Sequence, residues 1–382
     1  MNPNPLVELQ SLGQSIWIDF ISREMISSGE LQRLIQEDGV SGVTSNPSIF
    51  EKAITESDDY DEAIRALTLQ GKTADEIYQL LTVEDIQMVA DLLRPTYDRT
   101  DGQDGFVSLE VSPGLAHDTQ GTIREARLLW SLVERPNVMI KVPATREGIP
   151  AIEQITGEGI NVNITLLFGL PRYQEVINAY LDGLEILASQ GGNLKQVSSV
   201  ASFFLSRIDV LLDPVLEEKK RIDSLEADIA SVLHGQVAIA SARVAYQLYK
   251  ELFNSDRFAK LAHRGARTQR LLWASTSTKN PLYSDTKYIE PLIGPETINT
   301  LPVETLDPYR EHGQPHQSLE QDISQAYHVL NKLSLLGIDM DTATAQLEKE
   351  GVEKFVSALD RLMLSLKEKQ AAIASASMMD PK

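Results

Sequence analysis

The segment at residues 137–145, NVMIKVPAT, restricts the folds that this chain can adopt. Side chains of a strand alternate between two faces, so Met139 and Lys141 share one face and the branched residues of VMIKV share the other. Apolar residues on both faces indicate a strand buried on both sides, as in a parallel sheet covered by helices. A lysine in such a strand either extends to solvent or is an amine in an apolar setting, where it can act as a nucleophile toward carbonyls.

Segments with strand character alternate with helical ones along the chain. Strands are expected at residues 14–21, 42–47, 106–113, 137–145, 159–166 and 197–205. Residues 270–279 are expected to be a seventh strand that enters a hydroxyl-rich loop, and residues 288–302 an eighth strand followed by a proline-bounded loop. Helices are expected at about 29–37, within 55–99, at 122–134, 148–155 and 171–189, through most of 207–253 with an interruption near Pro214, and within 318–375. Thr73 and Glu76 have the spacing of a capping box at a helix start, and residues 102–105 are expected to be a loop.

Eight strands that alternate with helices predict an α/β fold, a single (β/α)8 TIM barrel with additional helices, the C-terminal ones packed on the barrel. The alternative is a doubly wound open sheet, which usually has a glycine-rich phosphate turn after its first strand. Neither G-x-G-x-x-G nor G-x-x-x-x-G-K-[ST] occurs in the sequence, so the barrel is favoured. We expect residues 1–375 to form one catalytic domain and residues 376–382 to form a flexible C-terminal tail.

Composition narrows the function classes. The chain has 55 acidic and 35 basic residues and a formal net charge of −20, which argues against a general nucleic-acid or membrane-surface binder. A phosphorylated small molecule is still compatible, since it needs only a few local cations. The absence of cysteine excludes disulfides, thiol catalysis, thiolate zinc sites and iron–sulfur clusters. Without a signal-like or membrane-spanning apolar segment, we expect a cytoplasmic enzyme, either a monomer or a small homo-oligomer.

Polar residues interrupt several of the expected strands near their C-terminal ends, where barrel active sites are built. These residues are Asp19, Asn46, Glu110, Lys141, Asn163, Thr165 and Arg207. Any one of them is compatible with an ordinary solvated strand end, but the set from six strands predicts a site. None of the six histidines falls on a strand end, which makes histidine catalysis and a zinc site weak hypotheses.

A lysine beside two carboxylates is compatible with several chemistries. It can be a structural ion pair, or it can attack a ketone while one carboxylate moves the protons of imine formation and the other deprotonates a substrate hydroxyl. Two carboxylates also suggest a glycosidase, but a lysine and two amides fit that reaction less well. They could instead hold magnesium in a metal-dependent aldolase or isomerase.

The motifs at these positions resemble those of the transaldolase family, and most closely its larger bacterial subgroup. The matching motifs, in family order, are WID at 17–19, GVTSNP at 42–47, LEVS at 109–112, IKVPAT at 140–145, GINVNITL at 159–166 and SFFLSR at 202–207. The resemblance implies a cofactor-free and metal-free enzyme of the non-oxidative pentose phosphate pathway. Such an enzyme moves a dihydroxyacetone unit from sedoheptulose 7-phosphate or fructose 6-phosphate to glyceraldehyde 3-phosphate or erythrose 4-phosphate. A second hypothesis is a Schiff-base aldolase that releases free dihydroxyacetone. A third is a catalytically inactive barrel that binds sugar phosphates.

The resemblance also implies residue roles. Lys141 forms the Schiff base with the C2 carbonyl, and Asp19 takes the proton from the C4 hydroxyl. Glu110 and Thr165, with a water, relay the protons of carbinolamine dehydration. The residues implied in substrate binding are Asn46, Asn163 and Ser202 for hydroxyls, Phe204 beside the lysine, and Arg207 with Ser275 for the distal phosphate.

The sequence departs from the family pattern after Ser275. Shorter family members carry an arginine soon after this serine, whereas this chain reads STSTK at residues 275–279. Either Lys279 supplies the second cation for the phosphate, or hydroxyls and backbone N–H groups do and Lys279 is an ordinary loop residue. A lysine is a point charge and not a bidentate fork, so the phosphate geometry is expected to differ.

Overall fold

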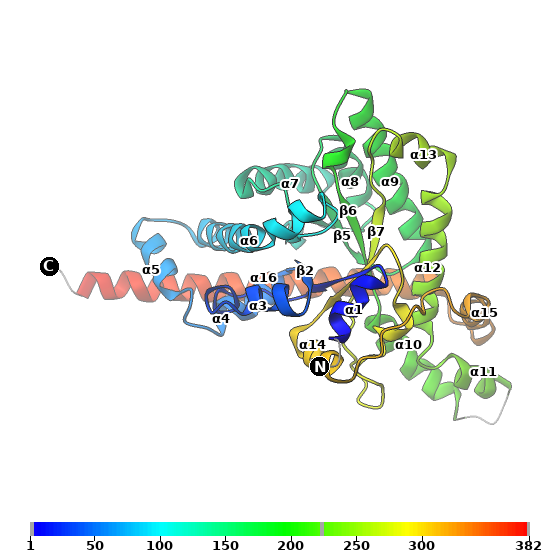
Figure 1. Ribbon diagram of the computed structural model, residues 1–382. Helices are drawn as coiled ribbons and strands as arrows, with labels where there is room; N and C mark the ends of the chain where they lie inside the picture. The colour runs from blue at the N-terminus through cyan, green and yellow to red at the C-terminus, as the bar shows by residue number, and fades with distance from the viewer. Residues whose placement is uncertain (1–3, 222–224, 380–382) are drawn as a thin grey trace.

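The structure is a computed structural model that describes residues 4–221 and 225–379. Its centre is a closed barrel of parallel strands in which each strand pairs with the next along the chain and β8 pairs with β1 (Figure 1). The strands are β1 (Gln14–Ile18), β2 (Val40–Val43), β3 (Phe106–Glu110), β4 (Val138–Pro143), β5 (Val162–Leu167), β6 (Ser199–Phe204), β7 (Gln269–Ala274) and β8 (Thr297–Leu301). The predicted (β/α)8 barrel is therefore confirmed.

Helices surround the barrel and fill the connections between its strands. The α-helices are α1 (Pro5–Ser11), α2 (Arg23–Ser27), α3 (Glu30–Glu37), α4 (Pro47–Thr55), α5 (Asp61–Leu69), α6 (Ala74–Arg99), α7 (Thr119–Val133), α8 (Gly148–Gly157), α9 (Leu170–Ser189), α10 (Ser206–Lys219), α11 (Leu225–Leu233), α12 (Val237–Phe253), α13 (Asp256–Ala262), α14 (Val303–His312), α15 (Ile323–Leu333) and α16 (Met340–Met379). Short 3-10 turns are η1 (Pro113–Leu115), η2 (Leu194–Gln196), η3 (Glu290–Leu292) and η4 (Ser334–Leu336). The capping box of Thr73 and Glu76 is present at the start of α6.

The strand register brings functional residues into one row. Glu110 on β3 is the register partner of Lys141 on β4, which is in turn the partner of Asn163 on β5. Register partners in a parallel sheet point to the same face, so these three side chains lie side by side. The alternation expected for the lysine strand is the reason that Lys141 shares this face.

Two prolines have roles other than those expected from the sequence. The strand expected at 42–47 ends at Val43, because Pro47 is the first residue of α4 and Asn46 is its N-cap, accepting a hydrogen bond from the backbone N–H of Ile49. Proline is suited to the first turn of a helix, where its missing N–H costs nothing. The interruption expected near Pro214 is wrong, since α10 continues through this residue to Lys219.

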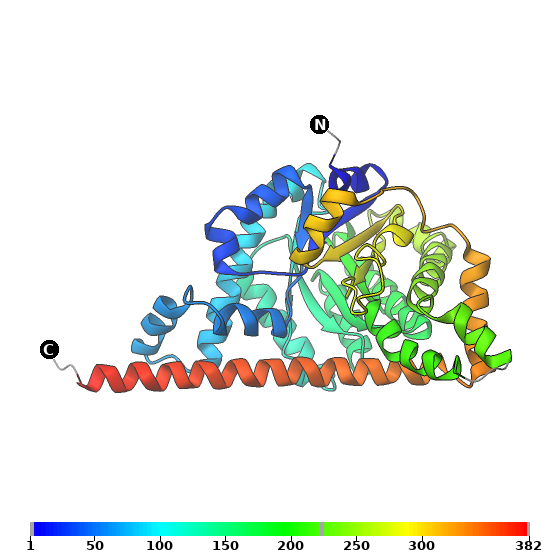
Figure 2. The same cartoon turned by 90° about the horizontal axis from the view of Figure 1, so that it is seen from below.

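The helix α16 lies across the end of the barrel where the strands finish, which we call the mouth. Figure 2 shows it, in orange to red, as one straight rod that extends beyond the barrel. Glycine at position 351 permits this close packing, because an added Cβ would lie 2.8 Å from Leu166 Cδ2 on β5 and 3.4 Å from the Arg207 guanidinium. The flexible tail expected from residue 376 is helical as far as Met379, and residues 380–382 lie outside the described part of the chain. The division into one domain stays a prediction. Among the described residues, no helix is long and apolar enough to cross a membrane.

Candidate active site

A cavity of about 960 Å³ opens at the mouth of the barrel beneath α16. The residues predicted for the site that line it are Asp19, Asn46, Lys141, Ser202, Phe204, Arg207, Ser275 and Lys279. The other three, Glu110, Asn163 and Thr165, are buried beside Lys141 on the neighbouring strands. The structure therefore gathers all the predicted residues at one end of the barrel.

Lys141 is held as a buried amine by two contacts. Its Nζ donates a hydrogen bond to the backbone carbonyl of Ser45 at 3.0 Å, and it lies 3.5 Å from Glu110 Oε2. The Ser45 carbonyl belongs to the turn between β2 and α4, and the Ser45 hydroxyl in turn donates to the carbonyl of Ser108 at 2.7 Å. The lysine thus reaches the cavity from a fixed position and does not extend to bulk solvent.

Glu110 is a carboxylate with unused hydrogen-bonding capacity. Neither of its oxygens accepts a hydrogen bond from the described residues, and the buried hydroxyl of Thr165 is also without a partner among them. Burial raises the pKa of Glu110 to about 7, against the opposing charge of Lys141 and with a further increase from Asp19. A carboxyl group with such a pKa can both donate and accept a proton near neutral pH.

Asp19 follows β1 directly and is oriented by hydroxyl groups. Thr44 donates to Asp19 Oδ1 at 2.7 Å, and the Thr44 and Thr300 hydroxyls are 2.9 Å apart. The sequence interpretation assigned Asp19 a role but gave none to Thr44, Ser45 or Thr300. The sequence did contain a sign that Thr44 and Ser45 belong to the site, because both are part of the TSNP motif. For Thr300 it contained none, because this residue lies in an expected strand without any distinguishing pattern.

Asn163 links two strands instead of facing the cavity. Its Nδ2 donates to Ser108 Oγ at 2.9 Å, and its Oδ1 accepts from Ser202 Oγ at 2.7 Å. Ser202 lines the cavity, so Asn163 orients a group that can reach a ligand. Asn46 uses its side-chain oxygen to cap α4, which leaves its amide N–H groups for a ligand.

The part of the cavity that Arg207 and Lys279 line is basic. The Arg207 guanidinium lies over the Phe204 ring, 5.3 Å from its centroid, and 6.0 Å from the Phe355 ring centroid on α16. Within the described residues it forms neither a hydrogen bond nor an ion pair, and burial lowers its pKa. Ser275 has a φ of 55° and shares a hydrogen bond with Ser206 at 2.9 Å, so a sterically unfavourable backbone holds its hydroxyl at the start of α10.

Lys279 lies on the loop after β7, lines the cavity and donates to the Ser277 hydroxyl. Phe204 packs against Arg207 and against Phe168, whose ring centroid is 5.2 Å away. Phe204 was expected to lie beside the lysine. In the structure, Phe204 and Lys141 line the same cavity. In the described part of the chain, histidine and carboxylate side chains form no group of three that could hold a metal ion.

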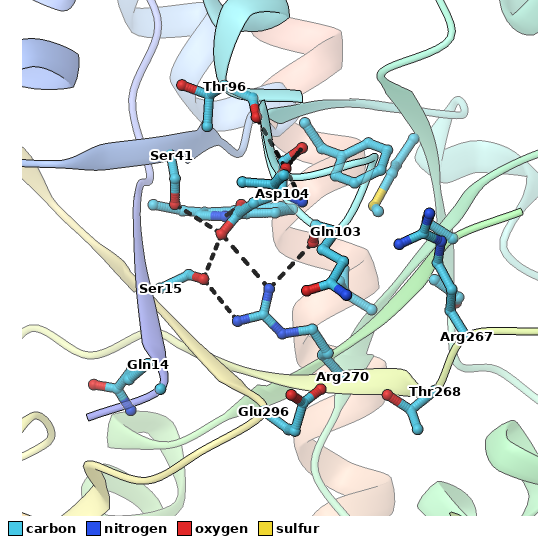
Figure 3. Close-up of a pocket in the computed structure, with 18 of the residues that line it drawn as sticks. Gln14, Ser15, Ser41, Thr96, Gln103, Asp104, Arg267, Thr268, Arg270 and Glu296 are labelled. Carbon is cyan, nitrogen blue, oxygen red and sulfur yellow. Dashed lines mark hydrogen bonds and ion pairs between the residues drawn. The ribbon is translucent and has the colours of Figure 1, made fainter. Parts of the chain in front are cut away.

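A second cavity, of about 490 Å³, lies at the opposite end of the barrel, where the strands begin. Figure 3 shows Arg270 pointing toward Asp104, with Ser15 and Ser41 around the same carboxylate. Asp104 accepts hydrogen bonds from Ser15, from Trp17 Nε1 at 2.7 Å and from Ser41 at 3.0 Å. The negative charge of Asp104 in this cluster is offset within the protein by Arg270, whose guanidinium lies 3.6 Å away.

A parallel barrel whose mouth contains a buried lysine beside one carboxylate, with a second carboxylate lining the same cavity, defines an enzyme that acts on carbonyl compounds through a Schiff base. Residues 16–366 match the family described as Transaldolase/Fructose-6-phosphate aldolase. The chain is 46% identical over 372 residues to Transaldolase 2 of a Nostoc species, covering 96% of this chain and 97% of that protein. It is 47% identical over 359 residues to a transaldolase of Thiobacillus denitrificans, covering 94% and 98%, and 46% identical over 364 residues to one of Saccharopolyspora erythraea, covering 95% and 97%. The chain belongs to the transaldolase/fructose-6-phosphate aldolase family.

Proposed function

We propose that the protein transfers a dihydroxyacetone unit from a ketose phosphate to an aldose phosphate. The donor is sedoheptulose 7-phosphate or fructose 6-phosphate, and the acceptor is glyceraldehyde 3-phosphate or erythrose 4-phosphate. The observation that carries the proposal is the buried lysine 3.5 Å from a carboxylate of raised pKa, with a second carboxylate lining the same cavity. The exchange belongs to the non-oxidative pentose phosphate pathway. We place it in the cytoplasm, since charged sugar phosphates do not cross membranes unaided.

The first stage is imine formation at Lys141. Its Nζ adds to the C2 carbonyl of the donor, and the resulting carbinolamine loses its hydroxyl group as water after that oxygen is protonated. Glu110, whose pKa is about 7, donates this proton, and Thr165, whose hydroxyl has no partner among the described residues, holds the departing water beside it. The product is an iminium ion on Lys141.

The second stage is carbon–carbon cleavage. Asp19, oriented by Thr44, takes the proton of the C4 hydroxyl, the C3–C4 bond breaks and its electron pair moves into the iminium. The aldose phosphate leaves, and the three-carbon enamine stays on Lys141. Ser202, oriented by Asn163, and the free amide of Asn46 are placed to hold its hydroxyls.

The third stage reverses these steps with a new acceptor. The enamine carbon attacks the acceptor aldehyde, Asp19 returns its proton to the new alkoxide, and water hydrolyses the iminium to release the new ketose phosphate. The Arg207 guanidinium and the Ser275 hydroxyl bind the distal phosphate of each substrate in turn. The buried position of Lys141 favours transfer, because bulk water has limited access to the enamine.

Trapping of the imine tests the proposal. Sodium borohydride with fructose 6-phosphate should reduce the imine and add a three-carbon or six-carbon adduct to the peptide that contains Lys141. Lys52, which lines the same cavity, is an internal control and should stay unlabelled. EDTA should leave the rate unchanged, as the Schiff-base route needs no metal. A wild-type enzyme that is neither labelled nor active would refute the proposal.

The family description also names an aldolase, which favours one alternative function. An aldolase would release dihydroxyacetone from fructose 6-phosphate in the absence of an acceptor. We expect transfer to erythrose 4-phosphate to be at least tenfold faster than this release. Faster release of dihydroxyacetone would establish the alternative.

A further inference from the structure

The cavity at the mouth holds a cation that the strand pattern could not reveal. Lys354 lies on α16 and lines the same cavity as Arg207 and Lys279. These three side chains come from separate elements: the start of α10, the loop after β7, and α16. Partial burial lowers the pKa of Lys354, and the positive charges of Arg207 and Lys279 lower it further. The three cations are therefore close enough to repel one another.

Such a cluster is unfavourable unless an anion offsets it. Four carboxylates line the same cavity, at Asp19, Glu304, Asp307 and Glu350, and the charges of Asp19 and Glu350 act on Arg207. Among the described residues, however, none of the four forms an ion pair with Arg207, Lys279 or Lys354. Within the described residues, Lys354 forms no ion pair or hydrogen bond.

The packing of α16 keeps Lys354 at this place. Gly351, one turn before it, lets the helix backbone approach Leu166 and Arg207, and Phe355 packs over the same guanidinium. A glycine inside a helix costs about 1 kcal/mol relative to alanine, so the close approach has an energetic cost that ordinary packing does not require. We attribute this glycine to the need to place α16 close to Arg207, over the phosphate end of the cavity.

We propose that Lys354 is a phosphate-binding residue that selects phosphorylated substrates and that it completes, with Arg207 and Lys279, the phosphate end of the cavity. The inference rests on the proposed function, because it assigns the second cation for the phosphate end of that site. Of the two lysines, Lys354 has the larger part: Lys279 already donates to Ser277, whereas none of the three N–H donors of Lys354 is used by a described residue.

Inorganic phosphate tests this assignment without turnover. We would measure its dissociation constant by calorimetry in wild type, Lys354→Gln, Lys354→Arg and Lys279→Gln. Lys349→Gln is the matched control, since Lys349 lies on the same helix and is exposed, with Glu353 as its partner. Loss of one charge-assisted contact should weaken phosphate binding about tenfold in Lys354→Gln. Lys354→Arg should restore part of the affinity, Lys279→Gln should have a smaller effect, and the control should stay within twofold.

Kinetics then relate binding to specificity. In Lys354→Gln, the ratio of kcat/KM for fructose 6-phosphate over unphosphorylated fructose should fall about tenfold, mainly through KM. Phosphate affinity and KM that both stay within twofold of wild type in a folded Lys354→Gln would overturn the inference. A wild type that binds phosphate through Lys354 but transfers no dihydroxyacetone would instead refute the proposed function, so the two failures are distinct.

Discussion

At the end of the barrel where the strands begin, Asp104 accepts hydrogen bonds from Ser15, Trp17 and Ser41, whereas at the mouth neither oxygen of Glu110 accepts one from the described part of the chain. Both carboxylates are buried, and both lie near a basic side chain: Arg270 is 3.6 Å from Asp104, and Lys141 is 3.5 Å from Glu110. Burial and pairing therefore do not distinguish the two ends. The number of donors around each carboxylate does.

This difference separates stabilisation from catalysis. A buried charge that is surrounded by donors has its hydrogen bonds satisfied and fixes the strands that carry those donors. A buried carboxylate with few donors has a raised pKa, is costly to keep, and is ready to exchange a proton. We expect substitutions at the two ends to affect different properties, and the following predictions are ordered by the size of the effect.

The largest effect is expected for Glu110→Gln, which keeps the shape of the side chain but cannot exchange a proton. The rate of imine formation should fall about 100- to 1,000-fold, the usual contribution of a general acid–base group. Because burial raises the pKa of Glu110 to about 7, the wild-type carboxyl group is protonated below this pH and loses its donor function as pH rises through it. The wild-type rate should show this decline, and the variant should lack it. Imine formation, measured by borohydride trapping against pH, checks both; a variant with an unchanged pH profile contradicts the role.

Asp104→Asn should instead destabilise the fold. An asparagine brings a donor group among the Ser15, Trp17 and Ser41 donors and leaves Arg270 without its negative partner. Breaking a buried pair of this kind should lower the free energy of unfolding by about 3 kcal/mol. Urea denaturation measures the loss. At a temperature where the variant is folded, kcat/KM should stay within twofold of wild type. An activity loss as large as that of Glu110→Gln would break the comparison.

The smallest effect is expected for Ser41→Ala, which removes one donor to Asp104 and leaves the others in place. The free energy of unfolding should fall by about 1 kcal/mol, the usual value of one buried hydrogen bond. The same denaturation experiment checks it. A loss as large as that of Asp104→Asn would show that the donors stabilise Asp104 only as a unit. The number of donors would then not explain the difference between Asp104 and Glu110.

Strand alternation explains why so much of the mouth could be predicted. Trp17 and Asp19 share one face of the first strand, and in the structure Trp17 reaches Asp104 at one end of the barrel while Asp19 lines the cavity at the other. The fold followed from the order of strands and helices, and the family from the motifs at the strand ends; alternation within each strand accounts for the gathering of the predicted residues. The roles assigned to individual site residues stay predictions.

Features that depend on long-range packing were not accessible from the same rule. Asp104 lies in a segment expected to be only a loop, and its importance comes from donors on β1 and β2 that converge in three dimensions. Lys354 is one of several lysines on a long helix, and only the docking of Gly351 against Leu166 distinguishes it. Pro47 and Pro214 show the limit at the local level. A proline fits a strand end and a helix start equally well, and the packing of a helix can offset the cost of about 3 kcal/mol that a proline has in its interior.

The position of α16 in the chain has a consequence for biosynthesis. Translation delivers the eight strands, Lys141 and both carboxylates before it delivers α16. A nascent chain can therefore close its barrel while the reactive amine still faces an uncovered mouth. The contribution that we propose for Lys354 to phosphate binding would be added afterwards, when α16 docks. On this proposal, the carbonyl chemistry and the full selection of phosphorylated substrates arise at different moments in the life of the molecule.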